Sequence, residues 1–574
     1  MAHCKGFLMR KTVTTAAAFL FISAMPAANA ADTAGGYDSL VSLSTQWREF
    51  AKPTVKNCLP DYGPEAMAKK AQELKSYQSR LASISTAGWS DSQQIDYELF
   101  KAELNGMDFD LRVLKPWVRD PSFYASVWAE QSDVPEHEGP SAEPIINLYE
   151  LTYPLSKADQ KKLTCLLGAV PALLEQAKIN MKDGNARDLW VYGTRAFREQ
   201  SKTLSELQEG TLVLRSLDSD AFPANLRGAD KALLSAVQKA RAATDAFRQY
   251  LDAQASSKTG PSGVGKENYD WYMKHVHLVP YTWDEQVTLL RRELERTRAA
   301  LELEEFRNRK LPPLEQVTSA EAYQAMADAK MSKIVSFLID GGIVPDKPYF
   351  RDALGQRKGG YTPPQTNNFF SNAMRHDPMP NYSHNYHWIE LARLKHEPHA
   401  SPIRSLTPVF DMYDSRSEGL ATAMEEVLMH AGMYDDDPRG REVVWILAAN
   451  RAARGLASLY VQSNEITLAE GGAFHARWTP RKWSDASSDL VGFEQLLYLR
   501  QPGYGTSYIT GKLLFDRLIS DYEAQQEDAG KPFDLAAFFQ EFNAAGIMPY
   551  PLIEQEMVKS PAHIGVPTAT KGSK

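Results

Sequence analysis

The sequence predicts an all-α protein: a large multi-helix body with a central cleft. In most segments apolar residues recur at three- and four-residue steps, which is the period of a helix. These segments are dominated by Ala, Leu, Gln, Glu, Lys and Arg, the strong helix formers. Alternating runs of β-branched residues, which would indicate strands, are almost absent.

The first thirty residues have the pattern of a signal peptide. Lys5, Arg10 and Lys11 form a basic start, Thr12–Met25 is apolar, and Ala28–Ala30 is a small-residue cleavage site. No Cys stands at the cleavage point, so we expect a released protein without a lipid anchor, cut near Ala30. A periplasmic or secreted location follows, and the periplasm of a bacterium fits best.

The charge balance excludes two kinds of partner. The chain has 64 basic and 72 acidic residues, and loss of the signal peptide leaves 61 basic residues against 72 acidic ones. An acidic surface argues against nucleic acid and against an anionic membrane as partners. Beyond the signal peptide, no stretch is apolar enough to span a membrane.

Two cysteines remain once Cys4 leaves with the signal peptide. Cys58 and Cys165 could form one disulfide in an oxidising compartment, or could be two unrelated buried thiols. The sequence gives no distance between them, so both interpretations stay open.

Residues 31–255 are expected to form an N-terminal helical half. Between Asp38 and Leu114 three helical patterns follow one another. Lys115–Ala142, rich in Pro, Trp and acidic residues, is expected to be a long ordered loop. The other helices expected in this half are Ile145–Leu155, Lys157–Met181, Asp188–Leu214 and Asn225–Gln254.

Ser256–Lys266 is rich in Gly, Ser and Pro and marks the boundary between the two halves. Gly260–Glu267 nearly matches a phosphate-binding loop. Glu267 stands where Ser or Thr would hold Mg²⁺, however, and a helix precedes the segment in place of a strand. We therefore interpret the segment as a simple loop within one continuous fold.

Residues 256–574 are expected to form the C-terminal helical half, which carries the candidate site. Within it, residues 343–381 are rich in Pro, Gly, Asn and aromatic residues, and a short hairpin is expected near residues 345–370, around Tyr349–Leu354. The helices expected here are Trp283–Arg309, Ala320–Leu338, Ser383–Arg393, Ser417–Met429, Arg441–Glu465 and a helix entered through Pro502-Gly503, with helices continuing to about Asn543.

Three residues of this half form a candidate metal site. His384 and His387 are three apart on one predicted helix, so their imidazoles project from one face. Glu418 opens the next helix and could supply a carboxylate. Two imidazoles, one carboxylate and an open position are the ligand set of hydrolytic zinc sites.

Each residue also has a structural explanation. A His pair beside Trp388 is often a hydrogen-bonded core pair, and an acidic residue such as Glu418 is favoured in a first helical turn by the helix dipole. The zinc-binding pattern H-E-x-x-H is absent, since Asn385 stands where its Glu would be. His396 and His399, in a proline-flanked loop, are alternative ligands.

The chain resembles the bacterial family of domain of unknown function 885, an all-helical relative of the gluzincin metallopeptidases. The family's second helix typically begins Glu-Gly-Trp-Ala, and Glu418–Ala421 matches it with Leu for Trp. Pro502, Gly503 and Tyr508 match a Pro-Gly segment followed by a helical Tyr. Arg451 and Arg454 match an Arg-rich helix, and Lys266–Tyr269 resembles a mid-chain signature. The resemblance is sharpest over Asn381–Leu514.

The chain departs from the family at the first motif. The family usually has His-Glu, two residues, then Pro-Gly-His, whereas this chain has His384-Asn385-Tyr386-His387. The Glu that would act as general base is therefore lost. The Asp and His that the family carries in a later helix are also missing, with Gln462 and Asn464 near those places.

The leading hypothesis is a zinc-dependent hydrolase of peptide or related amide bonds, with zinc held by His384, His387 and Glu418. Glu390, Glu397 and Glu425 are the candidate general bases. Tyr508, with Tyr504, would donate to the developing oxyanion, and Arg500 or Arg454 would bind a substrate carboxylate.

The alternative is a catalytically inactive helical protein that binds peptides or cell-wall fragments in the periplasm, which the missing His-Glu pattern favours. A serine hydrolase is disfavoured because G-x-S-x-G and S-x-x-K are both absent.

Overall fold

A computed structural model describes residues 36–131, 139–216, 221–355, 357–364, 368–410 and 414–559. Helices dominate these residues, and the strands among them are two or three residues long. The predicted all-α class is confirmed. The predicted signal peptide and the tail after His563 lie outside the described residues.

The chain begins with three helices and one hairpin. Ser90 caps the third helix, and its side chain and that of Gln93 exchange hydrogen bonds with the backbone as a capping box. The elements are α1 (Tyr37–Ala51), β1 (Thr54–Lys56), β2 (Leu59–Asp61), α2 (Pro64–Ala82) and α3 (Asp91–Phe109). The three predicted helical patterns are confirmed.

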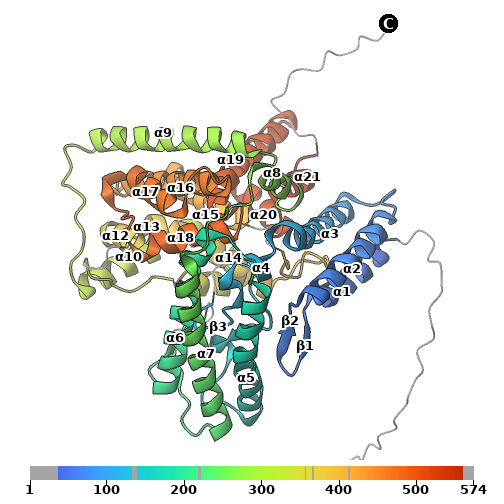
Figure 1. The fold of residues 1–574 in the computed structure, drawn as a ribbon. Coiled ribbons are helices and arrows are strands. Elements are labelled where there is room, and N and C mark those ends of the chain that lie inside the picture. The colour runs from blue at the N-terminus through green and yellow to red at the C-terminus, as the bar shows by residue number, and fades with distance from the viewer. Residues whose placement is uncertain are drawn as a thin grey trace, which may run out of the picture.

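The next unit is a group of long helices that forms the lower lobe in Figure 1, where α7 packs against both α5 and α6. Its elements are η1 (Asp110–Leu114, a π-helix), α4 (Pro116–Arg119), η2 (Pro121–Tyr124), β3 (Val127–Trp128), β4 (Ile146–Asn147), η3 (Leu148–Glu150), α5 (Lys157–Asn180), α6 (Arg187–Glu209), β5 (Val213–Leu214), β6 (Phe222–Pro223) and α7 (Lys231–Ala255).

Two predictions in this unit need correction. The helix expected at Ile145–Leu155 is wrong, because Ile146–Asn147 pairs in parallel with Val127–Trp128 and only a short 3-10 turn follows. Tertiary pairing here overrides local helical periodicity. The loop expected at Lys115–Ala142 contains the short helices α4 and η2.

A disulfide joins Cys58, in the β1–β2 turn, to Cys165 on α5, so one of the two interpretations left open is confirmed. The Cα atoms of the two cysteines are 5.8 Å apart, although the residues are separated by 107 positions in the sequence. The bridge fastens the N-terminal hairpin to the second helical unit.

The rest of the chain forms a larger helical body, with α9 running along its upper edge in Figure 1. Its elements are α8 (Lys266–His275), α9 (Trp283–Arg307), α10 (Ala320–Ile339), α11 (Pro348–Gly355), α12 (Phe369–His376), α13 (Met379–His384), α14 (Tyr386–His396), α15 (Asp414–His430), α16 (Gly440–Gln462), α17 (Leu468–Trp478), η4 (Pro480–Lys482), α18 (Asp489–Arg500), α19 (Tyr504–Asp528), α20 (Leu535–Ala545) and α21 (Tyr550–Met557).

Three predictions for this body are corrected. The hairpin expected near residues 345–370 is wrong for the described residues, because Pro348–Gly355 is helix α11 and buries Phe350 and Leu354. The helix expected through Ser383–Arg393 is broken at Asn385, which separates α13 from α14. Glu418 does not open its helix, since α15 begins four residues earlier at Asp414.

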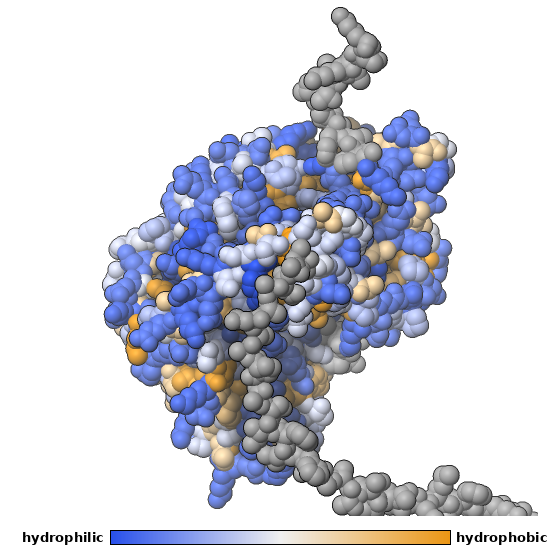
Figure 2. All heavy atoms as spheres, turned by 90° about the vertical axis from the view of Figure 1, so that its right-hand side faces the viewer, coloured by the Kyte–Doolittle hydropathy of each residue, from blue (hydrophilic) through white to orange (hydrophobic). Residues whose placement is uncertain are grey.

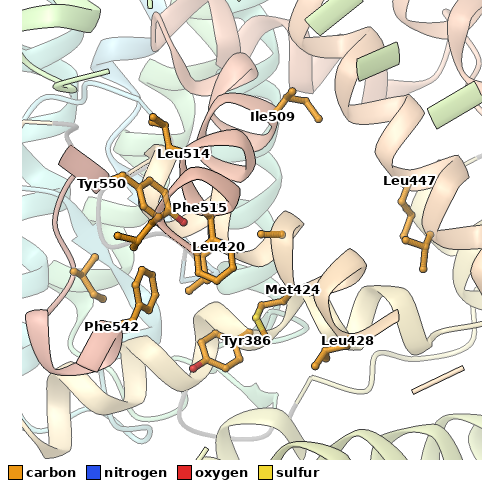
Figure 3. Packing of buried hydrophobic residues seen from close by; sticks show 14 of the residues in the cluster. Tyr386, Leu420, Met424, Leu428, Leu447, Ile509, Leu514, Phe515, Phe542 and Tyr550 are labelled. Carbon is orange, nitrogen blue, oxygen red and sulfur yellow. The ribbon is translucent and has the colours of Figure 1, made fainter. Parts of the chain in front are cut away.

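The central helices of this body are α15, α16 and α19. Leu420, Met424 and Leu428 come from α15 and meet Leu447 of α16 and Phe515 of α19 in one hydrophobic core (Figure 3). Because α15 and α16 are buried on almost every side, their polar residues must find partners inside the protein.

Two glycines allow α15 and α19 to approach closely. A Cβ atom on Gly419 would lie 2.4 Å from the Cα of Gly511, and one on Gly511 would lie 1.9 Å from the carbonyl oxygen of Ser415. Any larger residue would push the helices apart. This crossing brings Glu418 on α15 within reach of the first turn of α19.

Hydrophilic side chains dominate the face shown in Figure 2, and hydrophobic ones are scattered over it. Within the described part of the chain, no helix has both the length and the apolar character needed to cross a lipid bilayer.

Candidate metal centre

His384, His387 and Glu418 come together inside the helical body. One ligand atom from each lies within 4.8 Å of the others. His384 ends α13, His387 lies in the first turn of α14, and Glu418 lies on α15. We call these three residues the His–Glu cluster. Its two imidazole nitrogens and one carboxylate oxygen are ligand types that Zn²⁺ prefers.

The break at Asn385 arranges the two imidazoles. Asn385 has φ −64° and ψ 3°, which ends α13 and starts α14 in a new direction. The two rings lie with centroids 5.2 Å apart and planes 65° apart. His387 is buried, and the side chain of His384 keeps 17 % of its surface exposed.

Glu418 is a charged, buried carboxylate. Burial by itself would raise its pKa, but the hydrogen bond from His384, the positive charge of the imidazoles and the hydroxyl of Tyr504 together hold its pKa at about 2. The distance from Glu418 Oε2 to His384 Nε2 is 3.2 Å, and Tyr504 donates to Glu418 Oε1 at 2.7 Å. Tyr504 therefore orients a predicted ligand.

The left-handed backbone at Gly503 places Tyr504 at the start of α19. Gly503 has φ 99°, and a Cβ atom there would lie 2.8 Å from Met273 Sδ. The Pro502-Gly503 turn thus has a structural reason: it directs the first turn of α19 towards Glu418.

The other nitrogen of His384 faces a buried ion pair. Glu425 Oε1 lies 3.0 Å from His384 Nδ1, and Arg451 Nη2 lies 3.2 Å from the same nitrogen. Arg451 also donates to Glu425 Oε2 at 2.7 Å, and its Nη2 forms an ion pair with Glu425 Oε1 at 2.7 Å. With Nδ1 beside this ion pair, the ring presents Nε2 towards Glu418, where Nε2 could offer a lone pair to a metal.

The predicted general bases all form ion pairs with basic side chains. Both oxygens of Glu390 accept from Arg416, at 2.6 and 2.7 Å. Glu397 pairs with Lys347 at 2.6 Å near the surface, and Glu425 pairs with Arg451. The structure thus brings Glu425 to the cluster as a partner of His384 and gives Glu390 a structural partner.

The alternative ligands also lie in other contacts. His396 is exposed and stacks on Tyr349, with ring centroids 4.6 Å apart, while the Nδ1 of His399 accepts a hydrogen bond from the backbone N–H of Ser401. Neither belongs to the described group of potential metal ligands.

The predicted oxyanion donor Tyr508 and the predicted substrate-binding Arg454 lie near the cluster, whereas Arg500 forms other contacts. Tyr508 stacks near His384, with centroids 6.3 Å apart, and Arg454 lies 4.1 Å from the centre of the Tyr508 ring. Arg454 forms a buried ion pair with Glu494. Arg500 pairs instead with Asp120 at 2.6 Å and donates to the carbonyl of Pro140 at 2.8 Å, so it bridges the two halves of the chain.

Sequence reasoning missed the partners of these residues. Arg451 was noted only as part of an Arg-rich helix, yet its guanidinium lies against His384 and Glu425. Arg416 and Glu494 were not singled out at all. The acidic and basic members of these pairs are 26 to 40 residues apart, so no local spacing points to them.

The donor set fits a zinc ion. Zinc–ligand bonds of 2.0–2.2 Å place neighbouring ligand atoms of a tetrahedral site roughly 3.3 Å apart. The His384–Glu418 distance of 3.2 Å already matches this spacing. A carboxylate facing the non-ligating nitrogen of His384 is the usual support of a metal-binding histidine.

The chain belongs to the family described as bacterial proteins of unknown function (DUF885), whose model matches residues 44–333. The matched residues end before the His–Glu cluster. No curated protein matches the sequence.

Two solved structures share the fold. One is described as a "putative lipoprotein of unknown function" from Shewanella oneidensis, with 15% identity and a TM-score of 0.64 over 90% of this chain and 97% of that chain. The other is described as a "putative lipoprotein" from Colwellia psychrerythraea, with 14% identity and a TM-score of 0.59 over 92% of this chain and 99% of that chain. At these identities the likeness concerns the fold alone.

Proposed function

We propose that the protein is an exported zinc-dependent hydrolase that cleaves peptide or related amide bonds at the His–Glu cluster. The observation that carries the proposal is a buried two-imidazole, one-carboxylate donor set whose His384 is backed by Glu425 and Arg451. Export is supported by the N-terminal pattern and by the lipoprotein descriptions of the structural neighbours.

The zinc ion would be held by His384, His387 and Glu418 and would supply Lewis-acid chemistry to a substrate carbonyl and to water. Glu425 and Arg451 would hold the ring of His384 in place, and Tyr504 would hold Glu418. Donors that are held by such contacts need little reorganisation during a reaction.

Tyr508 is the candidate hydrogen-bond donor to the substrate. Burial raises its pKa well above its usual range, and the nearby charge of Glu418 acts in the same direction. The hydroxyl therefore keeps its proton at neutral pH. A neutral phenol beside the cluster can donate to an oxygen on which negative charge develops.

Zinc content of the purified mature protein tests the proposal. Mass spectrometry should find close to one zinc per chain in the wild type and none in the His384→Ala/His387→Ala double variant. His396→Ala, which changes an exposed histidine on the same helix as His387, should retain zinc. A wild type that holds no zinc after loading would remove the mechanism.

A second candidate function is supported by the engaged carboxylates. Glu390, Glu397 and Glu425 are all in ion pairs, so each of the predicted bases already has a cationic partner. A protein that binds peptides or cell-wall fragments without cleaving them needs no such base. Zinc-loaded protein that binds peptides from a library and leaves them intact would favour this function over hydrolysis.

A further inference from the structure

A cavity of about 550 Å³ lies where three parts of the chain meet, away from the His–Glu cluster. Its walls come from α1–α3, from the α4 region with residues 139–145, and from residues 407–410 and 500–501 of the C-terminal body. In Figure 1 this is the region in which α3 and α4 approach the larger body. Its volume is in the range of small-molecule sites, which are frequent at such junctions.

The lining of the cavity is mostly apolar and rich in aromatic rings. Tyr62, Trp117, Phe123, Tyr272 and Phe410 line it. The rings of Tyr62 and Phe123 pack edge to face, with centroids 4.9 Å apart. The first four are almost fully buried, so the walls are preformed. Such walls favour a ligand with an aromatic or branched apolar body.

One cation in the lining is held in place by the backbone. The Nζ atom of Lys70 donates to the carbonyl oxygens of Ala51 and Lys52, at 2.7 and 2.9 Å, where α1 ends. These contacts fix the position of the ammonium group. They bring only the partial negative charge of a helix C-terminus to it and no formal charge.

The acidic neighbours of Lys70 compensate its charge only in part. Glu143, which also lines the cavity, and Glu73 on the same helix attract its proton, while Glu49 at the end of α1 is paired with Lys52. Burial outweighs this attraction and lowers the pKa of Lys70 to about 8. An anion placed beside the ammonium would relieve that penalty.

We propose that this cavity binds small amphipathic carboxylates, with the apolar body among the aromatic rings and the carboxylate at Lys70. None of the three cluster residues lines the cavity. The site is therefore independent of the proposed metal chemistry.

Calorimetry with N-acetyl-phenylalanine and with its neutral amide tests the proposal. The acid should bind at least tenfold more tightly than the amide, and Lys70→Met should remove this preference. Lys69→Met, an exposed neighbour on α2, should bind as the wild type does. The His384→Ala/His387→Ala double variant should also retain binding, which separates this site from the metal centre.

The pH profile provides a second readout. Affinity for the acid should fall about tenfold between pH 7 and pH 9 in the wild type, because the ammonium group loses its proton. Lys70→Arg should bind with little change over that range. The proposal is overturned if the acid and amide bind equally, if neither binds at millimolar concentration, or if binding disappears in the histidine double variant and persists in Lys70→Met.

Discussion

His384 is the residue on which the candidate metal centre depends. One of its nitrogens faces Glu418 and the other faces the Glu425–Arg451 pair, so its orientation is set by its neighbours. His384 ends α13, Glu418 and Glu425 lie on α15, and Arg451 lies on α16. The centre is therefore a property of how α13, α15 and α16 pack together.

We expect Glu425→Gln to lower zinc affinity by about 10- to 100-fold, because it removes the negative charge that lies 3.0 Å from His384 Nδ1 and supports that ring. Competition with a chromophoric chelator measures this. Glu426→Gln is the matched control, since Glu426 is the next residue and its buried carboxylate pairs with Arg296 away from the cluster. This variant should leave zinc affinity unchanged. Equal losses in both variants would mean that Glu425 acts only through stability.

A second residue-scale effect concerns Glu103. Its buried carboxylate accepts from the backbone N–H of Val409 at 3.0 Å and of Phe410 at 3.1 Å, beside the cavity. Burial raises its pKa to about 7, although these two hydrogen bonds and Arg48 oppose the rise. The folded state therefore binds the proton more tightly than the unfolded state does.

The sign of the resulting pH dependence follows from linkage. The contribution of protonated Glu103 to the free energy of unfolding is fully present below the unfolded pKa of about 4.3. It is lost as pH rises through the folded pKa of about 7, and the free energy of unfolding falls by an amount on the order of 3 kcal/mol. Glu103→Gln cannot ionise, so its melting temperature relative to the wild type should rise between pH 5 and pH 8. Melting curves of the two proteins that shift in parallel with pH would contradict this assignment.

At the scale of elements, the crossing of α15 and α19 positions Glu418 against Tyr504. The crossing depends on Gly419 and Gly511, where the two backbones nearly touch. Side chains at these positions would need the helices to separate, since backbone atoms are the nearest neighbours. Helix spacing and ligand geometry are therefore coupled at this point.

Gly511→Ala should destabilise the protein by about 3 kcal/mol or more, because the new methyl group would overlap the backbone of α15. Thermal unfolding measures the loss. Gly492→Ala, in helix α18, is the matched control: no atom lies within 4 Å of its Cβ position, and the change should be neutral or stabilising by up to about 1 kcal/mol. Similar melting temperatures for both variants would show that the crossing tolerates a side chain.

At the scale of the whole molecule, buried ion pairs and a disulfide connect parts that are distant in sequence. Arg404 is fully buried and pairs with Asp96 on α3 at 2.8 Å and with Glu556 on α21. Arg500 and Asp120 form a second connection. These two pairs hold the earlier helices against the larger body, while Cys58–Cys165 fastens the N-terminal hairpin to α5.

Removing the disulfide should lower stability by up to about 5 kcal/mol, because the bridge closes a loop of 107 residues and restricts the unfolded chain. The Cys58→Ser/Cys165→Ser double variant should melt at a lower temperature than the wild type. Wild-type protein treated with reductant should melt like the variant. No shift in either case would show that the bridge does not constrain unfolding.

The sequence alone determined the helical class and the boundaries of most long helices, because period and helix-forming composition are local properties. It also pointed to His384, His387 and Glu418, since residue type and short spacing are visible in the chain. The break at Asn385, the α11 helix and the parallel pairing of Ile146–Asn147 were decided by tertiary packing.

Only the tertiary structure decided what the charged residues do. Arg451 meets His384 across 67 residues, Tyr504 meets Glu418 across 86, and Arg500 meets Asp120 across 380. No local pattern encodes such pairs, because burial forces each charge to find a partner wherever the fold brings one. The ligand types were therefore visible in the sequence, while their orientation and the cavity at the junction depend on the packed helices.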